Sequence, residues 1–307
     1  MAHDRLQTIC LEEPDRGMHP QMIERMNEVL HHESRKKTII VVTHSPFLVD
    51  STSLKNTFFF SRGANGSTVV NINDELEKNE YLKLLGTTEF KTLLFSSSVL
   101  FVEGPSDKIV LEAIFRKYKQ SSKSFADSFP ILRHEICSMG GKGIANRMKD
   151  FCKKLNIKFC VVTDRDVMMD DKGPQIKYRS SFSSDFIEDD CSISTFLEDK
   201  FKTFSDNLAE NENLFVWKHG ELEDFLLSKH QFEICKLLIP ENLSNEENYP
   251  FDVTDPHYKD SKGKINKSLN GGISRDKLDD LATLLLQFEE TGRLCIFLKN
   301  INDCKYP

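Results

Sequence analysis

The sequence predicts an α/β fold in which a parallel sheet is flanked by helices and preceded by a smaller α/β unit. Short apolar segments alternate with segments of helical periodicity, and this alternation is typical of parallel sheets. The apolar segments end in clusters of Glu, Asp or Gly, at the position where open parallel sheets bind ligands. The 307 residues, 39% hydrophobic and 29% charged, suit a soluble globular protein of about two domains.

The first unit is expected over residues 1–94, where apolar runs surround one segment of helical spacing. In that segment Ile23, Met26 and Leu30 fall on one helical face. We expect strands at 6–11, 38–42, 57–60 and 68–72, and a helix at 19–32.

The second unit is expected over residues 97–240, where the order strand, helix, strand, helix, strand predicts a parallel sheet. We expect strands at 99–102, 135–139 and 159–163, and helices at 107–117 and 144–155. Right-handed crossovers bring the carboxyl ends of such strands to one edge. The residues that follow each strand are therefore the candidate site residues.

Later segments carry weaker patterns. Residues 168–213 are polar and acidic, and we expect an insertion there with one helix near 193–204, followed by a short strand at 214–217. Residues 241–307 are expected to form a mostly helical extension. Within it, residues 246–275 are rich in Asp, Lys, Asn, Ser and Gly, which predicts loose structure, and 278–289 predicts the final helix.

Composition excludes several classes of protein. The net charge of −7 argues against a simple basic protein that coats nucleic acid, but it allows an enzyme whose carboxylates hold metal ions. The eight cysteines form no CxxC pair, so neither a zinc ribbon nor a disulfide framework is expected, and a cytoplasmic or nuclear location fits. No run approaches the roughly 18 apolar residues of a membrane span, and the first residues do not resemble a secretory signal.

Four carboxylates follow the predicted strands of the second unit. Glu103 follows the first strand, Asp107 opens the next helix, and Asp164 and Asp166 follow the third strand. Two residues that are two apart at the end of a strand point to the same side. Clustered carboxylates are ligands for Mg²⁺ or Mn²⁺, and two such ions about 4 Å apart can cleave a phosphodiester. Taken singly, each acid could instead be a helix cap or a solvated charge.

Two further features lie near this edge. Lys218 follows the short strand and could neutralise charge on a transferred phosphoryl group, while Glu221 and Glu223 could supply another ligand; the alternative is a charged helix start. Residues 140–143 (GGKG) precede a helix and could approach a phosphate. An ordinary tight turn with a solvated Lys142 explains that segment equally well.

These segments resemble a known family. Residues 101–107 (FVEGPSD), 161–166 (VVTDRD) and 215–223 (FVWKHGELE) resemble the Toprim domain of overcoming-lysogenization-defect (OLD) family nucleases, which include GajA. The resemblance covers about 97–228 and implies a Toprim-type sheet that binds two metal ions and cuts or nicks DNA. It assigns metal binding to the four carboxylates of the sheet edge, with Glu223 as a further ligand, and catalysis to Glu103 and Lys218.

The first unit is similar to the C-terminal portion of an ABC-type ATPase α/β domain. In residues 9–14 (ICLEEP), Glu12 resembles the Walker B acid that holds Mg²⁺, and Glu13 the catalytic glutamate. Asp15 falls at the D-loop, and residues 41–46 (VVTHSP) resemble the switch-histidine motif, with His44 sensing the γ-phosphate. The alternative is two ordinary buried strands with polar ends.

The Walker A phosphate loop and the ABC signature are not found in the chain. We therefore expect ATP to bind only if a complementary N-terminal ATPase half is supplied. A truncated gene model, a degenerate paralogue and one piece of a split assembly all agree with this departure.

The sequence thus favours a metal-dependent DNA endonuclease of the OLD type with an incomplete ATPase head. The resemblance adds a homodimer as the expected assembly, and no membrane partner is expected. The alternative is an inert remnant that binds nucleic acid or a partner. A topoisomerase or primase is disfavoured, because the chain has no recognisable nucleophilic tyrosine motif and no zinc module.

Overall fold

A computed structural model describes residues 7–49, 56–63, 66–71, 93–96, 98–123, 131, 134–140, 145–170, 175–181, 185–240 and 256–301. The chain divides into two compact units, one of Met1–Ser96 with Lys153–Ile157 and one of Ser97–Cys152 with Lys158–Pro307. The three domains expected at 1–94, 97–240 and 241–307 stay a prediction.

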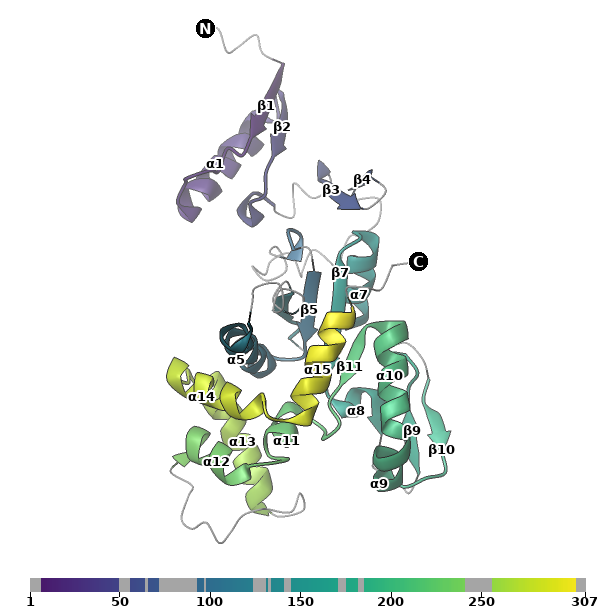
Figure 1. Ribbon diagram of the computed structural model, residues 1–307. Coiled ribbons are helices and arrows are strands. Elements are labelled where there is room, and N and C mark those ends of the chain that lie inside the picture. Colours follow the sequence, from purple (N-terminus) through teal and green to yellow (C-terminus); the bar gives the residue numbers. More distant parts are fainter. Residues whose placement is uncertain are drawn as a thin grey trace. The chain divides into compact units, whose positions relative to one another are not determined.

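The first unit contains two small sheets (Figure 1). Strands β1 (Thr8–Glu12) and β2 (Thr38–Val42) pair in parallel, and helix α1 (Pro20–Glu33) connects them. A short 3-10 helix, η2 (Pro46–Leu48), follows β2. Strands β3 (Phe58–Gly63) and β4 (Gly66–Asn71) form an antiparallel pair.

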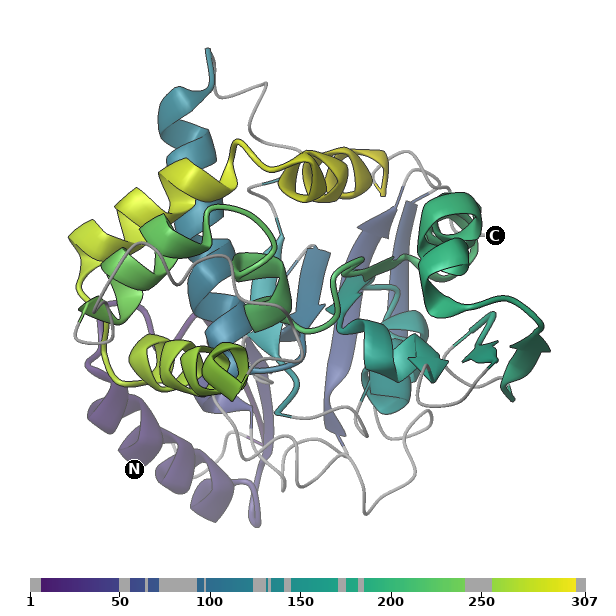
Figure 2. The same cartoon turned by 90° about the horizontal axis from the view of Figure 1, so that it is seen from below.

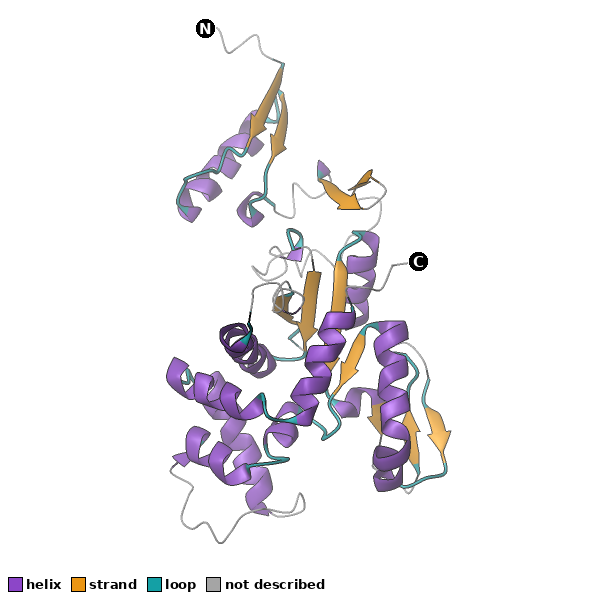
Figure 3. Ribbon diagram, in the orientation of Figure 1, coloured by secondary structure: helices purple, strands orange, loops and turns teal. Residues whose placement is uncertain are grey.

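The second unit is built on a four-stranded sheet of order β11-β7-β5-β6 in which all neighbours are parallel. Its strands are β5 (Ser98–Val102), β6 (Glu135–Ser138), β7 (Lys158–Thr163) and β11 (Leu214–Val216). Every residue of β5 is buried, because a central parallel strand is covered on both faces. The parallel sheet flanked by helices that the sequence predicts is therefore confirmed (Figures 2 and 3).

Helices connect and cover these strands. After β5 comes α5 (Pro105–Ser121), and before β7 comes α7 (Ala145–Lys154). The acidic segment after β7 contains a short helix, α8 (Arg165–Met168), and then a small antiparallel sheet that the sequence did not indicate. Its strands are β8 (Met169–Asp170), β9 (Ile176–Tyr178) and β10 (Ile187–Asp189). A helical run of α9 (Ile193–Thr195), η5 (Phe196–Lys200) and α10 (Phe201–Glu212) leads to β11.

The C-terminal helices share one core with the sheet. They are α11 (Leu222–Leu226), α12 (Gln231–Leu238), α13 (Pro256–Asn270), α14 (Arg275–Leu285) and α15 (Glu289–Asn300). Leu100 of β5, Ile265 of α13 and Leu281 of α14 belong to the same buried cluster, and α13 and α14 lie beside α5 (Figures 1 and 2).

Two predictions for this region are wrong. The segment expected to be loose, 246–275, contains helix α13, whose buried residues Tyr258, Ile265 and Leu269 are too sparse to give a clear helical signal. The expected final helix, 278–289, is split: α14 ends at Leu285, and α15 begins at Glu289. Glu289 and Glu290 lie in the first turn of α15, where acidic side chains are favoured by the helix dipole.

No helix in the described ranges combines the length and apolar character needed to cross a bilayer.

Candidate functional site

The predicted site residues follow the carboxyl ends of neighbouring strands. Val102 of β5 pairs with Ser138 of β6, and Val216 of β11 pairs with Thr163 of β7. The pairing of β7 continues one residue further, because the Trp217 N–H donates to the Thr163 carbonyl at 3.2 Å. The residues that come next, Glu103, Asp164 and Lys218, are therefore placed along one edge of the sheet.

Asp107 is the best-defined carboxylate of this edge. It lies in the first turn of α5, is 8% exposed, and accepts a hydrogen bond from the Gly104 N–H on Oδ2 at 2.9 Å. Burial raises the pKa of Asp107 to about 7, and the charges of Glu103 and Glu223 add to this rise, while the Gly104 N–H opposes it. Without a cation, burial and the charges of Glu103 and Glu223 therefore disfavour the charged form of Asp107.

Glu223 reaches the same place from a distant part of the chain. It lies in the first turn of α11 and is 6% exposed. Burial raises the pKa of Glu223, and Glu221 adds to the rise, whereas a hydrogen bond from Asn266 and the charge of Lys262 oppose it. Glu223 and Glu103 thus both lie near enough to Asp107 to act on its charge.

Asp164 and Asp166 are arranged differently from the expectation. Strand β7 ends at Thr163, Asp164 is the N-cap residue of α8, and Asp166 lies within that helix. Asp166 therefore does not continue the extended strand that the prediction assumed. Asp164 is half-buried and Asp166 is exposed.

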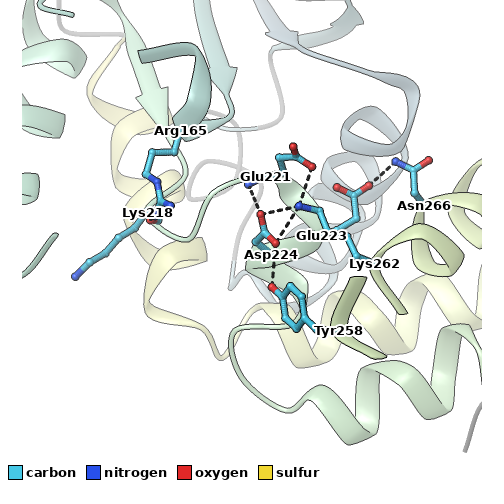
Figure 4. Close-up of polar contacts among 8 residues, drawn as sticks. All are labelled: Arg165, Lys218, Glu221, Glu223, Asp224, Tyr258, Lys262 and Asn266. Atoms are coloured by element: carbon cyan, nitrogen blue, oxygen red, sulfur yellow. Dashed lines mark hydrogen bonds and ion pairs between the residues drawn. The ribbon is translucent and has the colours of Figure 1, made fainter. Parts of the chain in front are cut away.

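The loop that carries Lys218 is fixed from two sides. The Lys218 N–H donates to Oε1 of Glu290 at 2.6 Å. Arg165 donates through Nη1 to the Lys218 carbonyl at 2.7 Å and through its N–H to the Gly220 carbonyl at 2.9 Å. In Figure 4 the Lys218 side chain extends away from Glu223, and it lines a cavity of about 740 Å³ bordered by α10 and α15. Its predicted catalytic role stays a prediction.

A second lysine, Lys262 of α13, lies among the carboxylates instead (Figure 4). Its Nζ is 2.9 Å from Oε2 of Glu221 and 2.9 Å from Oδ2 of Asp224. Burial opposes the charged form, but these two hydrogen bonds outweigh it and raise the pKa of Lys262. The Tyr258 hydroxyl also donates to Oδ1 of Asp224 at 2.9 Å.

Sequence reasoning missed Lys262, Asn266 and Glu290. The first two could have been found as polar residues four apart, had the helix that carries them been recognised. Glu290, which directly follows Glu289, gives no such signal.

The donor set suits a hard divalent cation. Glu103, Asp107 and Glu223 offer carboxylate oxygens, which Mg²⁺ and Mn²⁺ prefer. A bound cation would offset both the burial that raises the pKa of Asp107 and the smaller repulsion from Glu103 and Glu223. In the part of the chain that the structure describes, no three His, Cys, Asp or Glu side chains already converge as a ready metal site. The chemistry of these donors therefore fits a hard divalent cation.

The glycine-rich turn is only partly described. Gly140, which follows β6, has a positive φ of 67°. Residues 141–144, including Lys142, lie outside the described residues.

In the first unit, the predicted ATPase residues also follow parallel strands. Glu12 ends β1, and Glu13 has a positive φ of 43°, with its N–H donating to the Val42 carbonyl at 2.8 Å. The Thr43 hydroxyl donates to Oδ1 of Asp15 at 2.8 Å. This bond joins the loop after β1 to the loop after β2.

His44 belongs to that second loop and is exposed. The Ser45 N–H, one residue further, donates to Thr43 Oγ1 at 2.9 Å. The two loops thus bring the candidate ATPase residues to one end of the β1–β2 pair.

Two family models match the chain. Residues 94–166 match the Toprim domain of overcoming lysogenization defect protein-like proteins, and residues 1–50 match an AAA domain. The Toprim match contains Glu103, Asp107, Asp164 and Asp166 and stops before Lys218. The family resemblance seen in the sequence is therefore confirmed for both segments.

Among curated relatives, Endonuclease GajA of Bacillus cereus (strain HuB5-5) is 23% identical over 330 residues, which cover 93% of this chain and 46% of that protein. The OLD nuclease of Thermus scotoductus is 26% identical and covers 53% of this chain and 32% of its own length. The Old nuclease of Escherichia phage P2 is 26% identical over a stretch that covers 52% of this chain and 28% of that protein. The chain spans less than half the length of these relatives.

Proposed function

We propose that this chain is a metal-dependent endonuclease that nicks or cuts DNA at a two-metal Toprim site. One observation carries the proposal: the buried Asp107 is held at the start of α5, within the influence of Glu103 and Glu223, inside a segment that matches an OLD-like Toprim domain. Relatives named as nucleases support the reaction class. The inert-remnant alternative is not favoured by these findings.

The proposed ligands divide by position. Glu103, Asp107 and Glu223 form one group, and Asp164 and Asp166 provide the ligands that follow β7. Bound Mg²⁺ or Mn²⁺ ions would activate water and stabilise the leaving oxygen of a phosphodiester. We assign catalysis to Glu103 and Lys218. Since the Lys218 side chain points away from Glu223 (Figure 4), it has to rotate toward the edge to neutralise charge on the phosphoryl group.

The proposed partners follow from the same assignment. DNA is the substrate, and the active form is a homodimer. Glu12, Glu13, Asp15 and His44 act on ATP only when a complementary N-terminal ATPase half supplies the phosphate loop. A cytoplasmic or nuclear location agrees with the absence of disulfides among the cysteines that the structure describes.

The test is incubation of the purified chain with supercoiled plasmid and Mg²⁺ or Mn²⁺, with and without ATP. We expect relaxed or linear product with metal and none with EDTA. The matched control is Asp107→Asn, which removes the charge but keeps the shape of the side chain. Cleavage that survives chelation, or equal cleavage by this variant, would contradict the two-metal site. DNA binding without cleavage by the wild type would favour the inert alternative.

A further inference from the structure

One face of α13 carries a row of polar side chains that contact the acidic edge. Tyr258, Lys262, Asn266 and Asn270 are four residues apart, so they lie above one another on the helix. Tyr258 and Lys262 contact Asp224, as Figure 4 shows. The other two members, Asn266 and Asn270, form a separate connection.

That connection consists of two side-chain amides joined by a hydrogen bond. Asn266 donates through Nδ2 to Oε1 of Glu223 at 2.6 Å. Asn270 donates through Nδ2 to Oδ1 of Asn266 at 2.8 Å and to the hydroxyl of Ser106 at 3.2 Å. Ser106 immediately precedes Asp107 on α5, so the amides bridge two elements that each carry a carboxylate of the proposed site.

The direction of these hydrogen bonds follows from the chemistry of the amide group. An Asn side chain has one accepting oxygen and one donating NH₂ group. Because Asn270 donates to Oδ1 of Asn266, the Asn266 NH₂ group is directed toward Glu223. The second amide therefore selects the orientation in which the first can hold a carboxylate.

A neutral donor at this place differs from the lysine one turn before it. Lys262 brings a positive charge to Glu221 and Asp224, which offsets their charges. Asn266 holds the Glu223 carboxylate through a neutral N–H donor, so it adds no positive charge that would compete with a cation. Supporting partners of this kind orient metal ligands and typically change metal affinity about 10- to 100-fold when they are removed.

We propose that Asn266 is a positioning residue that holds Glu223 in the orientation for binding a divalent cation, and that Asn270 sets the orientation of Asn266. This inference rests on the proposed function, because it assigns a role within the same metal site. Asn266 and Asn270 are exposed at the helix surface, so replacing either leaves the core packing of α13 in place.

The test measures Mn²⁺ binding by calorimetric titration of the full chain, without DNA. We expect Asn266→Leu to weaken Mn²⁺ binding about tenfold or more, and Asn270→Leu to weaken it less. Lys264→Ala is the matched control, since Lys264 lies on the same helix in an exposed ion pair with Asp260, and it should bind Mn²⁺ like the wild type. In plasmid cleavage, Asn266→Leu should raise the Mn²⁺ concentration for half-maximal rate while largely keeping the rate at saturating Mn²⁺.

The outcomes separate the two proposals. If the wild type takes up no Mn²⁺, the metal site itself is refuted, and the role of Asn266 falls with it. If the wild type binds Mn²⁺ and both amide variants bind it equally well, only the positioning role is overturned. A lower melting temperature of the variants with unchanged Mn²⁺ affinity would likewise show that the amides serve stability alone.

Discussion

Glu290 accepts a hydrogen bond from the backbone N–H of Lys218 at 2.6 Å, although 72 residues separate them in sequence. The same buried carboxylate pairs with Arg293 Nη1 at 3.0 Å and lies 3.4 Å from His219 Nε2. The first turn of α15 therefore fixes the loop that carries the proposed catalytic lysine. The geometry of that loop depends on the C-terminal helices as well as on the Toprim sheet.

Replacing Glu290 should impair both stability and cleavage. Glu290→Leu leaves the Lys218 N–H and the Arg293 guanidinium without their shared acceptor, and we expect a loss of about 2–4 kcal/mol in the free energy of unfolding. Urea unfolding and plasmid cleavage at saturating Mn²⁺ measure the two effects. Glu289→Leu, at the exposed neighbouring position, is the control. A folded Glu290→Leu protein that cleaves at the wild-type rate would show that the loop needs no such anchor.

The sheet and its acidic edge could be predicted because their signals are local. A buried strand such as β5 contains a continuous apolar run at 99–102, and the acid after it needs only the parallel topology to be placed. The parallel order brings Glu103 and Asp164 to one edge whatever the details of their loops. Motif order then supplied Glu223, although nothing local distinguishes it from Glu221.

The supporting residues could not be predicted, because their roles depend on contacts between distant segments. Asn266 lies in a helix whose sequence is polar and contains Gly263, so neither its periodicity nor its position near Glu223 was visible. Glu290 lay just beyond the expected helix 278–289, because the start of α15 at Glu289 was not recognised. The backbone at Asp166 differs from the expectation for a local reason: one turn of helix begins directly after Asp164, which an apolar strand pattern does not indicate.

Asp107 should make the stability of the metal-free protein depend on pH. Its pKa is raised from the ordinary 3.8 to about 7, mainly by burial. A carboxyl with a higher pKa in the folded than in the unfolded chain binds more protons when folded. Its contribution to stability is therefore present below about pH 4 and is lost as the pH rises through about 7.

Asp107→Asn should remove this dependence. At pH 8 without metal we expect the variant to be more stable than the wild type by up to about 4 kcal/mol, since one pKa unit corresponds to about 1.4 kcal/mol. Urea unfolding in EDTA at pH 5 and pH 8 measures the difference. If the free energy of unfolding changes equally in the two proteins between pH 5 and pH 8, the pKa of Asp107 is not raised by folding. In the wild type, Mn²⁺ affinity should rise with pH up to about 7, because protons and metal compete for this carboxyl.

Variants of two other acids should differ from the wild type in how Mn²⁺ changes their melting temperature. Glu103→Ala and Asp164→Ala each remove one charge from the acidic edge, so the melting temperature without metal should hold or rise. Saturating Mn²⁺ should reverse the order, because a ligand stabilises only a protein that keeps its site. Both variants should also lose cleavage. A wild type that shows no melting shift with Mn²⁺ would mean that these carboxylates are ordinary surface charges.

The ATPase residues should be inactive in this chain alone. Glu12, Glu13 and Asp15 lie near one another through the contacts of the loops after β1 and β2, but no phosphate loop is found in the sequence to bind ATP. We expect no ATP hydrolysis above that of Glu13→Gln, measured by phosphate release. Micromolar ATP binding by the wild-type chain in a calorimetric titration would contradict this. Binding that appears only with a separate ATPase half would support a split assembly.

Replacement of the two lysines near the acidic edge should change different properties of the protein. Lys262 is a counter-ion of Glu221 and Asp224, so Lys262→Met should lower the free energy of unfolding by about 1 kcal/mol. It should also strengthen Mn²⁺ binding, because a positive charge near Glu223 is removed. Lys218 lies on the anchored loop with its side chain directed away from the acids (Figure 4).

Lys218→Met should therefore leave both the Mn²⁺ affinity and the metal-free stability near wild type while reducing the cleavage rate at saturating Mn²⁺, because its expected role is to offset charge in the transition state. Calorimetric titration, urea unfolding and single-turnover plasmid cleavage of the two variants give the comparison. If Lys262→Met abolishes cleavage with intact Mn²⁺ binding and Lys218→Met does not, the catalytic cation is Lys262, and the assignment made from the motif at 215–223 is wrong.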